Sequence, residues 1–377
     1  MKARKILFAI LFLIFSLINP TDSIGAVTPI AGKACKPAGT TQIYKDLKFT
    51  CVKTGKKLIW DKGIPNSTQT TSTANAPKTE IPTITNFSDL RSRYLEFHSL
   101  AWKKAMEQIS KSKENSTQIF EIVGPNSKKC TGKIIDAIRT TQKLYAATNL
   151  PAALKILYAD KGDEDWLYQE TKKHLRPFEL QTQGNVQVNP HSVNGQTKEA
   201  VEWVQDSCTE TRPNFLDGSA SAHGYTHTIQ KMQFTSSDSQ GGLWGKAPRW
   251  LLEGGATFSD QIIMYKNDES RWMDFLPRNI GYELRKLDLD SFNEYFNSDD
   301  WQPTDKFPNQ LAYDLGVMVC EILVAMKGPS ILIDLYADLS QTQDFDVTFK
   351  NKFGVTWKQA SPDVAYAVYK YIKNWVS

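Results

Sequence analysis

The sequence is poor in the side chains that build most catalytic centres, with five histidines and five cysteines among 377 residues. It has no Gly-x-Ser-x-Gly segment to present a serine nucleophile and no glycine-rich loop to hold a phosphate. These absences argue against a serine hydrolase of that kind and against a phosphate-binding enzyme. Glycoside hydrolysis by paired carboxylates stays open, because any two acidic residues can meet once the chain folds.

An excess of charge of one sign is also missing. Lysine and arginine number 45 against 41 aspartates and glutamates, so the net charge is +4. The chain has no general basic footprint, and we expect no nucleic-acid partner. Hydrophobic residues at 41% and charged residues at 23% exclude a collagen, a long coiled coil and a fully disordered chain. The length allows one large domain and a small one.

Long hydrophobic runs of the kind that cross membranes are missing beyond the start of the chain. Three basic residues precede an apolar run over residues 6–18, and Ala26 ends the segment with a small residue. This run is shorter than the roughly 20 residues that a spanning helix needs. Residues 1–26 are therefore predicted to be a signal peptide, with an uncleaved anchor as the alternative. We expect a secreted, extracellular mature protein without a transmembrane span.

The expected extracellular location favours disulfide bonds between the cysteines, because disulfides form readily outside the cytosol. A local disulfide between Cys35 and Cys51 is predicted, and a second between Cys130 and Cys208 is a further hypothesis. Cys320 lies in an apolar run, residues 315–326, which predicts a buried free thiol that packs like a small hydrophobic residue.

Residues 27–63 are predicted to form a small basic β module. Residues 33–63 contain eight lysines against two aspartates, and short strands are expected over 42–44, 47–52 and 57–60. The pattern from Cys35 through Cys51 to Trp60 resembles a Cys-pair module found near the start of many bacterial secreted proteins. Its lysines can dock on an anionic cell wall or membrane surface, or form a merely solvated basic face.

Two further segments complete the chain. Residues 64–85 are rich in Ser, Thr, Asn and Pro and are predicted to be a linker. Residues 86–377 are predicted to be the main domain, with helices over 88–109 and 133–147 and strands over 119–123 and 153–158. An acidic turn over residues 160–165 can bind a cation, but a solvated loop between strand and helix is the favoured interpretation.

His223 and His227 are the most informative residues. They are four positions apart, so a helix places both imidazoles on one face, where they can bind one Zn²⁺. Ser219 or Ser221 is predicted to cap this helix, and Pro248 to open the next, which carries Glu253. Glu253 can supply a third ligand, and three ligands leave the fourth position of a catalytic zinc site open.

The spacing resembles the gluzincin metallopeptidases, which carry His-Glu-x-x-His on one helix and a ligating Glu on the next. The histidines match at His223 and His227, and the third ligand matches within Trp250-Leu-Leu-Glu253-Gly254-Gly-Ala256. The resemblance covers about residues 200–375 and extends through Tyr313-Asp-Leu-Gly316. It implies an α+β fold, predominantly helical with a small sheet, and a zinc ion held by the three matched residues.

One departure from the family's pattern is decisive. The resemblance implies a glutamate after the first histidine as general base, and this chain has Gly224. Losing a positioned base costs about 10²–10⁴ in rate. Asp217, Glu164 and Asp165 are candidates to replace it.

Two further residues have candidate roles beside the metal. Tyr313 is a candidate to stabilise an oxyanion, with a buried helix tyrosine as the favoured alternative. Asp260 is a candidate to orient a ligating histidine, or else an exposed helix residue. We expect the remaining histidines, His98, His174 and His191, to be structural.

The sequence therefore predicts a secreted zinc-binding, metallopeptidase-like protein that accepts a peptide or protein ligand in its cleft. Hydrolysis is expected to be weak or lost, so the chain is either a slow enzyme or a pseudoenzyme. The alternative is a non-enzymatic, cell-wall-associated binding protein on a peptidase-like fold. A third possibility is that the histidine pair is structural and the domain holds no metal.

Overall fold

The computed structural model describes residues 31–36, 40–44, 47–55, 57–65, 83–113, 117–129, 133–146, 149–160, 162–173, 189–194, 199–205, 217–234, 246–279, 282–298 and 306–374. The predicted signal peptide, most of the predicted linker and the hypothetical Cys130–Cys208 pair lie outside these ranges. The chain divides into two compact units, Met1–Thr79 and Glu80–Ser377, which are treated separately below.

The first unit is a small antiparallel sheet. Strand β2 (Leu47–Thr54) lies between β1 (Thr41–Tyr44) and β3 (Lys57–Trp60), and β4 (Ile64–Pro65) also pairs with β2. Cys35 and Cys51 form the predicted disulfide, with 5.8 Å between their Cα atoms. The disulfide packs against Phe49 and Trp60. So few apolar side chains bury little area, and the covalent link offsets the shortage.

The second unit contains a four-stranded mixed sheet in the order β5-β6-β8-β7. Strands β5 (Gln118–Val123), β6 (Ala153–Ala159) and β8 (Glu199–Gln205) are parallel, and the edge strand β7 (Asn189–Asn194) is antiparallel to β8. On β6, Leu154 and Ile156 join the main hydrophobic core, whereas Leu157 and Ala159 belong to a separate cluster. Burial on both faces is typical of a central parallel strand covered by helices.

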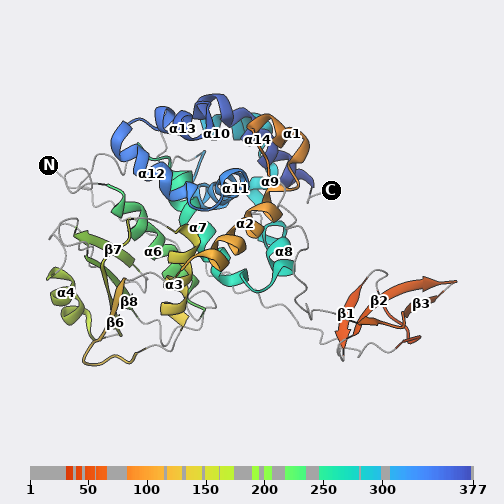
Figure 1. Ribbon diagram of the computed structural model, residues 1–377, viewed down its shortest axis with the longest axis horizontal. Helices are drawn as coiled ribbons and strands as arrows, with labels where there is room; N and C mark the ends of the chain where they lie inside the picture. The colour runs from red at the N-terminus through yellow and green to blue at the C-terminus, as the bar shows by residue number, and fades with distance from the viewer. Residues whose placement is uncertain are drawn as a thin grey trace, which may run out of the picture. The chain divides into compact units, whose positions relative to one another are not determined.

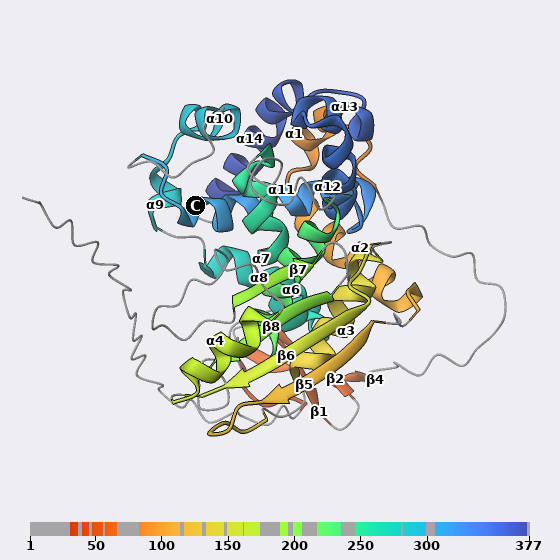
Figure 2. The same ribbon diagram turned by 90° about the vertical axis from the view of Figure 1, so that its left-hand side faces the viewer.

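Helices make up most of the rest of the second unit. They are η1 (Phe87–Asp89), α1 (Leu90–Arg93), α2 (Phe97–Lys111), α3 (Lys133–Tyr145), α4 (Glu164–Lys172), α6 (Ser219–Met232), α7 (Arg249–Tyr265), α8 (Glu269–Asn279), α9 (Tyr282–Lys286), α10 (Leu289–Asn297), α11 (Gln310–Lys327), α12 (Ile331–Thr342), α13 (Phe345–Phe353) and α14 (Trp357–Asn374). Figures 1 and 2 show α4 on one face of the sheet and α3 and α6 on the other, with α10 to α14 gathered at the opposite end of the unit. The predicted α+β class, predominantly helical with small sheets, is confirmed.

Helix α11 is the most buried helix, and Cys320 within it is a fully buried free thiol, as predicted. Among the described residues no single helix is long and apolar enough to cross a membrane. Within the same residues one pair of helices, α11 and α12, is long and apolar enough when taken together, and the two are bent by 95° relative to each other.

The helix predicted over residues 88–109 is interrupted. The chain forms η1, then α1, then a turn over residues 94–96, and only then α2. Helix α1 packs on α14, whereas α2 packs on α11. The two segments serve different partners, so the chain changes direction between them.

Candidate metal centre

Helices α6 and α7 bring together His223, His227 and Glu253. Glu253 Oε2 lies 3.8 Å from His223 Nε2 and 3.4 Å from His227 Nε2. One potential ligand atom from each residue lies within 4.8 Å of the others, so the group can hold a metal ion. Two ligands at 2.0–2.1 Å from one tetrahedral zinc stand roughly 3.3–3.5 Å apart, so small side-chain movements suffice.

Each histidine is oriented by a hydrogen bond at its other ring nitrogen. His223 Nδ1 donates to Asp260 Oδ2 at 3.1 Å, and His227 Nδ1 donates to Gln230 Oε1 at 2.8 Å. Gln230 Nε2 donates to the carbonyl of Leu252 at 3.1 Å, which fixes the amide so that its oxygen faces His227. Both Nε2 atoms are thereby directed at Glu253, an arrangement that favours metal ligation.

The second oxygen of Glu253 faces a cation. Arg249 lies one turn earlier on α7, and its guanidinium is 3.5 Å from Glu253 Oε1. The same guanidinium donates a hydrogen bond to Asn309 Oδ1. With Oε1 held by Arg249, Oε2 is the oxygen that remains for a metal ion.

Tyr313 of α11 stands beside this group. Its ring stacks on His223, with centroids 5.9 Å apart and planes 13° apart. Burial raises the pKa of the Tyr313 hydroxyl, and the nearby Glu253 carboxylate raises it further. The hydroxyl therefore keeps its proton at neutral pH and can donate a hydrogen bond.

A contact between two glycines brings α11 this close to α7. A Cβ on Gly254 would lie 2.2 Å from the carbonyl carbon of Gly316, and a Cβ on Gly316 would lie 2.6 Å from the carbonyl oxygen of Trp250. These are backbone atoms, which cannot move aside as a flexible side chain can. The two helices therefore cross with their backbones in contact, and Tyr313, one turn before Gly316, reaches the histidines.

The protonation of the metal-free group follows from its contacts. Burial lowers the pKa of His223, but hydrogen bonds to Asp260 and Glu253 outweigh it and raise the pKa to about 9. Burial dominates at His227 and lowers its pKa. The Glu253 carboxyl is buried too, yet its hydrogen bonds to the two histidines hold its pKa well below the usual range. A metal ion bound at His223 Nε2 would therefore displace a proton from this residue.

The candidates for a replacement base do not join this group. Gly224 lies buried on α6, and among the described residues the metal-ligating group contains only the three side chains named above. Asp217 accepts a hydrogen bond from the Ser219 amide at 2.8 Å, just before α6. Glu164 and Asp165 lie in the first turn of α4, across the sheet from α6 (Figure 1).

Other sequence expectations have simpler outcomes. The predicted cap of α6 is wrong: its N-cap is Gly218, at φ +82°, where a Cβ would lie 2.6 Å from the Lys133 carbonyl oxygen. In the acidic turn, Asp163 accepts hydrogen bonds from both nitrogens of Asn126, which makes it a loop anchor.

The histidines expected to be structural can be checked at one position. His98 is fully buried between Glu321, at 2.8 Å, and the Trp272 carbonyl oxygen, at 2.9 Å. His174 and the side chain of His191 lie outside the described residues.

Gln230 and Arg249 were missed by reasoning from the sequence. A signal was present, because each lies one helical turn from a proposed ligand, Gln230 from His227 and Arg249 from Glu253. Only the packing of α6 on α7 reveals what their side chains reach.

Comparisons with models of protein families, with curated proteins and with solved structures find no match to this chain. The resemblance to gluzincins therefore rests on the motif residues themselves.

Proposed function

We propose that this chain is a secreted zinc-binding, metallopeptidase-like protein whose peptide hydrolysis is weak or lost. One observation carries the proposal: both ligand histidines donate from Nδ1 to fixed acceptors and direct Nε2 at Glu253. Three ligand atoms that converge in this way suit one metal ion. The disulfide agrees with an oxidising compartment.

Each residue of the site has a separate role in this proposal. His223, His227 and Glu253 would hold the ion, which when bound supplies a Lewis acid that polarises a peptide carbonyl. The protonated hydroxyl of Tyr313, whose ring stacks on His223, would donate a hydrogen bond to the oxygen of that carbonyl. No carboxylate stands at position 224 to accept or deliver a proton. Peptide binding is therefore expected to be better preserved than turnover.

The first test is the zinc content of the purified mature protein, by mass spectrometry after reconstitution and dialysis. We expect about one zinc per chain, and loss of it in His223→Ala. Tyr313→Phe is the matched control, because it keeps the stacked ring and should keep the metal. A wild-type chain that binds no zinc would overturn the proposal and favour a structural histidine pair.

A second candidate function is non-enzymatic attachment to an anionic surface through the first unit. Lys33, Lys36, Lys53, Lys57 and Lys62 are all exposed. The only described carboxylate in this unit, that of Asp61, accepts hydrogen bonds from two backbone amides, at 3.0 and 2.9 Å. Among the described residues, these lysines have no acidic partner.

Cosedimentation with isolated bacterial cell walls and with anionic vesicles tests this second function. We expect binding that weakens as salt rises, because exposed charges are screened. Replacing Lys53 and Lys57 by Gln should weaken it further, while leaving zinc content unchanged. Unaltered binding in that variant would contradict the assignment.

A further inference from the structure

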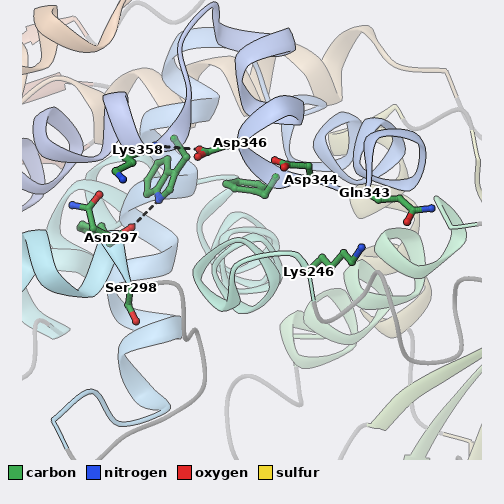
Figure 3. A pocket seen from close by; sticks show the side chains of 10 residues that line it. Lys246, Asn297, Ser298, Gln343, Asp344, Asp346 and Lys358 are labelled. Atoms are coloured by element: carbon green, nitrogen blue, oxygen red, sulfur yellow. Dashed lines mark hydrogen bonds between the residues drawn. The ribbon is translucent and has the colours of Figure 1, made fainter.

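A pocket of about 440 Å³ lies at the helical end of the second unit and shares no residue with the metal centre (Figure 3). Its three aromatic side chains, Phe296, Phe345 and Trp357, are buried and pack on one another. The polar side chains around them carry charges of both signs, which favour no particular ligand. A group that can select a ligand lies instead beside the metal centre, at Arg249.

Arg249 presents a cation at the edge of the proposed metal group. It is the first residue of α7, one turn before Glu253, and its guanidinium lies 3.5 Å from Glu253 Oε1. This distance is longer than that of a normal hydrogen bond, so the contact is an ion pair that leaves donors unused. The Arg249 side chain is 27% exposed, so a ligand bound at the metal group can reach it.

The guanidinium of Arg249 is held in place and incompletely paired. It donates a hydrogen bond to Oδ1 of Asn309, the N-cap residue of α11. Its Nε–H is buried and has no acceptor among the described residues. A guanidinium offers five N–H groups in a planar fork that matches the two oxygens of a carboxylate. A fixed fork with unused donors is suited to binding a second carboxylate in addition to that of Glu253.

Glu253 shows that one carboxylate can span the gap between this fork and the histidines. Its Oε1 faces Arg249, whereas its Oε2 lies 3.8 Å from His223 Nε2 and 3.4 Å from His227 Nε2. A ligand carboxylate that enters beside Glu253 can lie in the same way, with one oxygen toward Arg249 and the other toward the metal group.

The balance of charge around the metal group favours an anion. Glu253 and Asp260 are the described carboxylates that contact the two histidines and Arg249. A divalent ion and the guanidinium would bring three positive charges against these two negative ones. Gly224 supplies no carboxylate where the gluzincin pattern has one. The loaded site would then carry an excess of positive charge, which attracts an anionic group.

We propose that Arg249 binds a carboxylate of the ligand, so that this site selects peptides with a free C-terminal carboxylate or an acidic side chain. This inference rests on the proposed function, because it uses the same site, and it names the class of peptide that the site binds. Affinity for a carboxylate agrees with weak turnover, since one product of peptide hydrolysis is itself a carboxylate.

The test is calorimetric titration of the zinc-loaded full mature chain with three matched peptides. They are N-acetyl-Ala-Ala-Ala as the free acid, the same peptide as its C-terminal amide, and N-acetyl-Ala-Glu-Ala as its C-terminal amide. We expect at least one of the two acidic peptides to bind about tenfold more tightly than the neutral amide. The acidic peptide that binds identifies the source of the carboxylate.

Variants of Arg249 separate ligand binding from a structural role. Arg249→Met keeps the apolar stem without the charge, so the preference for acidic peptides should fall below about twofold. Arg249→Lys keeps a cation beside Glu253 and loses the fork, so it should keep the zinc and lose most of the preference. Arg271→Met, at an exposed position on α8, is the matched control and should keep the full preference. A purely structural arginine would weaken the binding of acids and amide alike.

The two proposals at this site fail in different ways. A wild-type chain that binds no zinc overturns the proposed function and this inference with it. A zinc-loaded chain that binds the acids and the amide equally, or binds none of them at tens of millimolar, overturns the carboxylate site alone. A full preference for acidic peptides in both Arg249 variants also overturns the carboxylate site.

Discussion

Position 224 limits the chemistry of the proposed metallopeptidase-like site, because glycine has no side chain. The two histidines, the glutamate and the tyrosine stand together as a metallopeptidase-like site requires, but Gly224 brings no proton acceptor. Glycine also costs a helix about 1 kcal/mol relative to alanine, so helix stability does not account for it.

Replacing Gly224 by Glu should raise peptidase activity of the zinc-loaded protein at least about tenfold, because a positioned base is typically worth 10²–10⁴ in rate. Hydrolysis of an internally quenched peptide library measures this directly. Gly224→Gln is the matched control: it has the same size and cannot accept the proton, so it should gain nothing. Equal rates in a folded, zinc-loaded Gly224→Glu would show that the cleft has lost substrate geometry as well.

The pairing of His223 with His227 could be predicted from the sequence because helical spacing is local. His223 and His227 share a helix face in any fold that keeps α6 helical. Neither the distance to Glu253 nor the role of Gln230 follows from spacing, because both depend on how α7 lies across α6. The roles of Asp260 and Tyr313 were open alternatives for the same reason.

At the scale of the helices, the crossing of α7 and α11 determines both where Tyr313 lies and how the core packs. Gly254 and Gly316 let two backbones touch, and that contact places Tyr313 over His223. The same helices supply many of the buried apolar side chains of the unit. Site geometry and core packing therefore depend on the same contact.

We expect Gly316→Ala to destabilise the second unit by about 1–3 kcal/mol, because the added Cβ meets backbone atoms and forces the helices apart. The gain in helix propensity, about 1 kcal/mol, opposes this only in part. Urea unfolding measures the change, and Gly316→Val should cost more than Gly316→Ala. Unchanged stability in both would show that the helices do not need this close approach.

His98 of α2 and Glu321 of α11 form a buried pair. This pair makes the stability of the second unit depend on pH. Burial raises the pKa of Glu321, so the folded state holds its proton more tightly than the unfolded chain does. Its contribution is then greatest in acid and is lost as the pH rises above the ordinary glutamate range. Glu321→Gln should therefore gain melting temperature relative to the wild type at pH 7 but little at pH 4.

Thermal unfolding of the Glu321→Gln variant at the two pH values provides this measurement. Exposed Glu269→Gln on α8 is the control, because it removes a carboxyl group without touching the buried pair. An equal gain in melting temperature for Glu321→Gln at pH 4 and pH 7 would contradict a raised pKa of Glu321 in the folded state.

At the scale of the whole molecule, the chain combines two units that are stabilised in different ways. The first relies on the Cys35–Cys51 disulfide and the buried side chains of Phe49 and Trp60, and the second on a continuous core of helices and one sheet face. Each unit should therefore respond separately to damage.

Replacing Cys35 and Cys51 by Ser should destabilise the first unit by about 2–5 kcal/mol and unfold it at 37 °C. Hydrogen–deuterium exchange should show loss of protection over residues 47–60 and none over α7 and α11. Cys320→Ser, which places a hydroxyl in the core of α11, is the reciprocal variant and should affect only the second unit. Loss of protection in both units for either variant would show that they fold together.

The sequence by itself determined the local features: the Cys35–Cys51 staple, the first strands, the helices of the motif and the spacing of its histidines. Each depends on residues close together in the chain, where periodicity and loop length act directly. Tertiary structure alone decided which side chains reach His223, His227 and Glu253, and why residues 88–109 form separate helices. These depend on contacts between residues far apart, such as Gly254 with Gly316 and Tyr313 with His223, and the free energy of such contacts exists only once the helices pack.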